Sequence, residues 1–76
     1  MSRAEVSENA RRVEVLVSPF VGEHAAEFAQ HLRLLGFTVR VVIADGQGLG
    51  FFMDYQPNRV NVIVEASVVT AIHSIG

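Results

Sequence analysis

Three side chains that could bind a metal ion lie close together between residues 24 and 31. His24, Glu27 and His31 are separated by three and four positions, so on a helix they would share one side, and zinc sites use such spacings. Gln30 and Arg33 lie nearby, which favours a solvated polar face with an ordinary Glu27–His31 pair at i, i+4. We therefore interpret these residues as a polar helix surface and expect no metal ion or other cofactor.

Three glycines at a spacing of two could form a phosphate-binding loop. Gly46, Gly48 and Gly50 would then have to open a helix, as the glycines of a dinucleotide-binding fingerprint do. The residues that follow are Phe-Phe-Met-Asp-Tyr, which do not begin a helix, and the chain has no lysine for a Walker-type loop. No serine has a neighbouring pattern that nominates a catalytic base, and His73 stands alone. The sequence therefore predicts a protein that is not an enzyme.

Composition and charge restrict the kinds of partner and the cellular locations that fit the chain. The net charge is −2 and the only basic cluster is Arg11-Arg12, followed by Glu14, which disfavours nucleic acid as a partner. The polar stretch over residues 1–10 lacks the apolar region of a signal peptide, and no apolar run is long enough to cross a membrane. A cytoplasmic chain and a mature secreted form both fit. We expect a loose arm over residues 1–10 and a single domain over 11–76.

Alternating valines predict a strand over residues 11–17. Val13, Val15 and Val17 recur with a period of two, and Pro19 ends the pattern. Other stretches rich in β-branched residues predict three further strands, at 37–44, 59–66 and 68–72.

A helix is predicted between Val21 and Gly36. Its apolar residues recur at i, i+3, i+7 and i+10, which is a helical spacing: Ala25, Phe28, Leu32 and Leu35. Gly36 then stands where a left-handed C-cap is expected. The order of elements predicts an α+β fold in which a single helix packs on a small mixed β-sheet with a long exposed loop.

The connection from Asp45 to Asn58 is unusually long for a compact domain. Connections of this length generally bind something or are disordered, and three large apolar residues in a row argue against disorder. One interpretation is a hairpin, with residues 50–55 as a strand, a turn at Gln56-Pro57-Asn58 and a return along the strand that begins at 59. The other is an exposed binding loop. Local sequence patterns do not separate the two.

The last third of the chain carries short motifs in a characteristic order. They are Met53-Asp54, then Arg59-Val60-Asn61-Val62, then the stretch from Val69 to Ile75-Gly76. In this order they resemble the reactive-site half of the potato inhibitor I family, the small inhibitors of chymotrypsin and subtilisin. The run Asp54-Tyr55-x-Pro-x-Arg-x-Asn is also similar to microbial inhibitors of elastase-like proteases. The resemblance extends more weakly back to Pro19, and residues 11–17 have no counterpart in it.

This resemblance implies a serine endopeptidase of the chymotrypsin or subtilisin type as the partner. The loop over residues 45–58 would bind it as a substrate does, with Met53 in the primary specificity pocket and Met53–Asp54 as the reactive bond. Arg59 would brace the residues that flank this bond, with Asp54 as its partner. The implied protease-binding residues are consecutive: Leu49, Gly50, Phe51, Phe52, Met53, Asp54 and Tyr55.

The chain departs from the family pattern in and beneath the loop. Asn61 stands where the family usually has a second bracing arginine, and Phe52 where it usually has a threonine. Gly48 and Gly50 fall where stiffer residues are usual, and glycine adds conformational freedom. These differences predict a loop that is held less tightly than in the family.

A non-inhibitory interaction module is the alternative function. In that case Phe51-Phe52-Met53 would form an apolar edge or patch that pairs with another protein or with a second copy of the chain. A homodimer with this segment in its interface would be expected.

Overall fold

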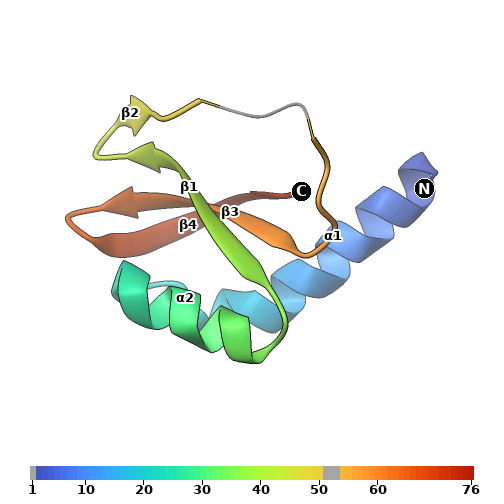
Figure 1. Cartoon of the computed structure of the whole chain (residues 1–76), viewed down its shortest axis with the longest axis horizontal. Coiled ribbons are helices and arrows are strands. Elements are labelled where there is room, and N and C mark those ends of the chain that lie inside the picture. Colours follow the sequence, from blue (N-terminus) through green and yellow to red (C-terminus); the bar gives the residue numbers. More distant parts are fainter. Residues whose placement is uncertain (1, 51–53) are drawn as a thin grey trace.

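The computed structural model describes residues 2–50 and 54–76, and Figure 1 shows how the elements are arranged. The helical elements are α1 (Arg3–Val17), the 3₁₀ turn η1 (Ser18–Phe20) and α2 (Ala25–Leu34). The strands are β1 (Thr38–Ala44), β2 (Gln47–Gly48), β3 (Arg59–Glu65) and β4 (Val68–Ile75). The three strands predicted after residue 36 are therefore confirmed, the last of them longer than expected.

Within the described residues, the strands form one mixed sheet in the order β2-β1-β3-β4. Strand β1 runs parallel to β3, whereas the pairs β1–β2 and β3–β4 are antiparallel. Figure 1 shows the helices below the sheet and the described parts of the connection between β2 and β3 above it. The predicted α+β fold with a mixed sheet is confirmed. The prediction of a single helix is wrong, because both α1 and α2 pack on the sheet.

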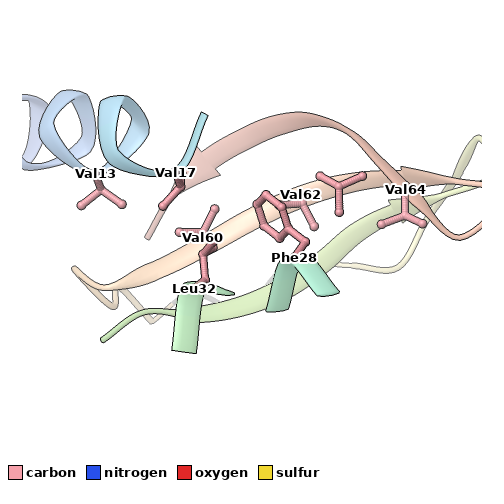
Figure 2. Close-up of a cluster of buried hydrophobic side chains, with 8 residues drawn as sticks. Val13, Val17, Phe28, Leu32, Val60, Val62 and Val64 are labelled. Carbon is pink, nitrogen blue, oxygen red and sulfur yellow. The ribbon is translucent and has the colours of Figure 1, made fainter. Parts of the chain in front are cut away.

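Both helices contribute to one hydrophobic cluster against the sheet, drawn in Figure 2. Its buried members come from α1, α2, β3 and β4: Val13, Val17, Phe28, Leu32, Val60, Val62, Val64 and Val69. Burying one side chain of this size contributes about 1.5–3 kcal/mol, so the cluster dominates the stability of the domain. Successive side chains of a strand point to opposite faces, so Arg59 and Asn61 lie on the face of β3 that the helices do not cover.

The strand predicted over residues 11–17 is wrong, because this segment belongs to α1. Ser2 caps the helix, its Oγ accepting a hydrogen bond from the Glu5 N–H at 3.2 Å. Val13 and Val17, four positions apart, are buried, whereas Val15 is 68% exposed. The boundary expected at residue 10 is also absent, since α1 runs across it from Arg3.

Helix α2 matches the predicted helix in position and in its buried face. Phe28 and Leu32 are fully buried, but Leu35 lies after the last helical residue and is 47% exposed. Gly36 has a φ of 90°, which is the left-handed conformation expected after the helix.

The hairpin between residues 50–55 and the following strand, one of the two interpretations of this connection, is absent from the described part of the chain. Strand β2 instead pairs with β1 across a two-residue turn, in which Asp45 and Gly46 have φ values of 50° and 80°, as a type I′ turn requires. Residues 54–58 form no strand. Because β1 and β3 are parallel and each has seven residues, the chain must travel back about 20 Å before β3 begins. The connection is therefore a crossover, and its length follows from the topology.

Three of the valines of α1, namely Val13, Val15 and Val17, test the helix directly. We expect Val13→Ala and Val17→Ala each to lower the free energy of unfolding by about 1–3 kcal/mol, because both side chains are buried. Val15→Ala should change it by less than about 0.5 kcal/mol, because that side chain is exposed. Urea unfolding of the three variants measures the difference. A strand would place all three on one face, so three equal losses would contradict the helix.

Candidate functional site

The candidate site is the crossover between β2 and β3, and its first half is attached to the sheet at Leu49. The Leu49 N–H donates to the Val42 carbonyl of β1 at 2.8 Å, while 58% of the Leu49 surface is exposed. Gly50 follows with a φ of 89°. The predicted residues Phe51, Phe52 and Met53 lie outside the described residues. The chain is described again from Asp54, at the start of the second half of the crossover.

Arg59, the first residue of β3, holds Asp54 at the start of this second half. Its Nη2 donates to the Asp54 carbonyl at 2.8 Å, and its Nη1 lies 3.3 Å from Asp54 Oδ2. The same guanidinium binds the end of the chain, because Nη2 and Nε donate to the Gly76 carbonyl at 2.8 and 3.1 Å. The Gly76 N–H returns a bond of 2.8 Å to the Arg59 carbonyl. The contact that the resemblance implies between Arg59 and Asp54 is thus present.

The carbonyl bonds contribute more to this attachment than the ion pair does. A short hydrogen bond from a charged donor to a carbonyl is strong, whereas water screens an ion pair that has an exposed member. The Arg59 side chain is only 13% exposed, but that of Asp54 is 52% exposed. The hydrogen bond from Arg59 nevertheless lowers the pKa of the Asp54 carboxyl below its ordinary value of 3.8. Asp54 is therefore tied mainly through its backbone carbonyl, which does not titrate.

Tyr55 packs its ring directly on Gly76. A Cβ atom placed on Gly76 would lie 2.9 Å from Tyr55 Cδ2, closer than such atoms approach, and the φ of Gly76 is 135°. Glycine is therefore required here by both the close approach and the backbone conformation. The last residue of the chain supports the predicted protease-binding segment from beneath, at Tyr55 as well as at Asp54.

A layer of polar side chains lies on the same face of the sheet as Arg59. Asn61 is 3% exposed, accepts a hydrogen bond from Arg40 Nε at 3.2 Å and donates one to Ser74 Oγ at 3.1 Å. These residues come from three adjacent strands and are in register. The position where the family usually has a second arginine is therefore filled by an amide that links three strands. A guanidinium still lies beside it, supplied by β1.

His31 does not form the predicted pair with Glu27 on α2. His31 Nδ1 lies 2.9 Å from Glu23 Oε1, before the helix, and not against Glu27, and its ring stacks on Phe20 with a centroid separation of 4.8 Å. His24 caps α2 through a bond from the Ala26 N–H to its Nδ1.

Among residues 2–50 and 54–76 no group of three histidines, cysteines or acidic residues could hold a metal ion. Nor does any helix in that part of the chain have the length and apolarity to cross a membrane.

The sequence does not predict the contact of Asn9 with Pro57 or that of Arg59 with Gly76. Asn9 of α1 donates to the Pro57 carbonyl at 2.8 Å, and Gly76 carries the bonds described above. Both pairs are distant in the sequence, so no local periodicity encodes them. For the contacts of Gly76, the local signal is a glycine at the end of a strand rich in β-branched residues. The resemblance includes this glycine but gives it no role.

Comparisons with protein-family models, with curated proteins and with solved structures find no match to the chain.

The pKa of Asp54 tests its contact with Arg59. In an NMR titration of the Asp54 carboxyl carbon, we expect a midpoint below 3.8, which moves up toward 3.8 in Arg59→Gln. Since the pKa is lowered in the folded state, the carboxylate contact is complete above pH 3.8 and is lost as the pH falls through the lower midpoint. Arg33→Gln, which removes an exposed arginine from α2, is the matched control. A wild-type midpoint at 3.8 or above would contradict the contact.

Proposed function

We propose that this protein inhibits serine endopeptidases of the chymotrypsin or subtilisin type by presenting the crossover between β2 and β3 as a substrate. Met53 enters the primary specificity pocket, and Met53–Asp54 is the reactive bond. The resemblance of residues 53–76 to the potato inhibitor I family motivates this assignment. In this proposal the protein is a ligand of an enzyme and catalyses nothing itself.

The observation that carries the proposal is the attachment of Asp54 to the body of the domain. Arg59 Nη2 bonds to the Asp54 carbonyl and to Gly76, both at 2.8 Å, and the Arg59 side chain is largely buried. A loop that is already fixed loses little entropy on binding, so more of its contact energy is available as affinity. This arrangement is expected of an inhibitor and is not needed for a loop that serves only as a crossover.

The same attachment separates an inhibitor from an ordinary substrate. The protease serine attacks the Met53 carbonyl carbon, forming an acyl-enzyme and releasing the amino group of Asp54. In a substrate this amine diffuses away, and water then hydrolyses the acyl-enzyme. Here the bonds from Arg59 to the Asp54 carbonyl and carboxylate keep the amine near the acyl carbon, so its return attack competes with hydrolysis.

A titration of active subtilisin and chymotrypsin with the purified protein tests this function. We expect loss of activity in proportion to added protein, and mass spectrometry should show at most slow cleavage, confined to Met53–Asp54. Met53 has no charge, so a trypsin-like protease with an acidic pocket should be unaffected by the wild type and inhibited by Met53→Arg.

Other outcomes of this titration separate the alternatives. Unaffected proteases and an intact chain would contradict the proposal and favour the interaction module that self-associates through Phe51-Phe52-Met53. Rapid cleavage at Met53–Asp54 without inhibition would mean that the loop is offered as a substrate but is held too loosely to inhibit.

A further inference from the structure

Helix α1 reaches the second half of the crossover through one polar side chain. Asn9 Nδ2 donates to the Pro57 carbonyl at 2.8 Å and lies 3.5 Å from Tyr55 Oη. A carbonyl oxygen can only accept, so the partner fixes which atom of the Asn9 amide is the nitrogen. These contacts join residues 48 and 46 positions apart and place the helix against the crossover. In Figure 1 the α1 ribbon passes close to the segment that enters β3.

Asn9 occupies a position that the packing of α1 alone does not explain. It precedes the buried Val13 and Val17 at spacings of four and eight, so it continues the stripe of α1 that faces the domain. Asparagine within a helix is unfavourable, because its side chain competes for backbone hydrogen bonds. An apolar residue would extend the stripe at no such cost. The contact with Pro57 gives the amide a function that a valine or alanine could not perform.

The contact from α1 is separate from the one made by Arg59. Arg59 holds Asp54, at the start of the segment 54–58, whereas Asn9 holds Pro57, three residues later. Pro57 lies in the turn that leads into β3, where the Arg59 N–H donates to the Gln56 carbonyl at 3.1 Å. The segment 54–58 is thus held at Asp54 from the sheet and at Pro57 from the helix, beside the packing of Tyr55 on Gly76 and the bond of 3.0 Å from the Thr38 N–H to the Asn58 carbonyl. Neither contact by itself restrains both ends of it.

We propose that Asn9 is a positioning residue for the reactive loop, and that α1 acts through it as a second brace on the leaving-group side of the Met53–Asp54 bond. This proposal rests on the proposed function, since it assigns Asn9 to that bond. The new amino terminus at Asp54 can attack the acyl-enzyme only while the segment behind it keeps its place. Asn9 supplies that restraint at Pro57, and Val13 and Val17 anchor the helix that carries it.

Three variants of α1 test this role. Asn9→Ala removes the donor, and Asn9→Asp keeps the shape but replaces the donor by an acceptor that faces the Pro57 carbonyl. Ser7→Ala is the control, because it introduces alanine into the same helix at a position exposed to solvent. The first readout is ¹⁵N relaxation of the Tyr55, Gln56 and Asn58 amides without protease. The second is the rate at which subtilisin cleaves Met53–Asp54.

In both Asn9 variants we expect lower order parameters at these amides and faster cleavage, by about threefold to tenfold for one lost hydrogen bond. The thermal midpoint should stay near that of Ser7→Ala, which should behave as the wild type in both readouts. Unchanged order parameters, or unchanged cleavage despite lower order, would overturn the proposal. If the wild type fails to inhibit, the proposed function is wrong, and the relaxation data still decide whether Asn9 holds the loop.

Discussion

The guanidinium of Arg59 joins three parts of the chain: the start of β3, the crossover and the end of β4. It stands at the first position of β3, in the sheet, and binds both Asp54 in the crossover and Gly76 at the end of β4. A largely buried charge of this kind is stable only if its donors are occupied, and Asp54 and Gly76 together occupy them. The position of Asp54 and the path of the last residue both depend on this one side chain, and Tyr55 packs on the glycine that it binds.

Sheet topology places the loop where Arg59 can reach it. Because β1 and β3 are parallel, the chain must cross back over the sheet between them, and the helices already occupy one face. The described parts of the crossover lie on the other side of the sheet, where Arg59 of β3 binds Asp54. The hydrophobic cluster beneath fixes β3 in turn, through Val60, Val62 and Val64. The hydrophobic core thus fixes the strand that carries Arg59, and the proposed function depends on the bond from Arg59 to Asp54.

Local patterns predicted the sheet and α2 well but failed at α1. The strands after residue 36 are rich in β-branched residues, and Val60, Val62 and Val64 of β3 are buried in the cluster at a spacing of two. Gly36, with a positive φ, follows the end of α2. The segment from Val13 to Val17 alternates valines in the manner of a strand. It is nevertheless helical, because the residues before it favour a helix that Ser2 caps, and because Val13 and Val17 are buried together at a spacing of four. The contact of Arg59 with Asp54 could be expected only from the resemblance. Those of Asn9 with Pro57 and of Tyr55 with Gly76 join distant residues, which no local pattern encodes.

Re-formation of the reactive bond tests the central claim, that the domain holds the leaving group in place after cleavage. The chain cleaved between Met53 and Asp54 is incubated with a catalytic amount of subtilisin and followed by mass spectrometry. We predict that intact chain reappears in the wild type and in Arg33→Gln until cleavage and re-formation balance, and that far less forms in Arg59→Gln, where Asp54 loses its anchor. A wild-type chain that stays cleaved, or whose two fragments separate, would contradict the account.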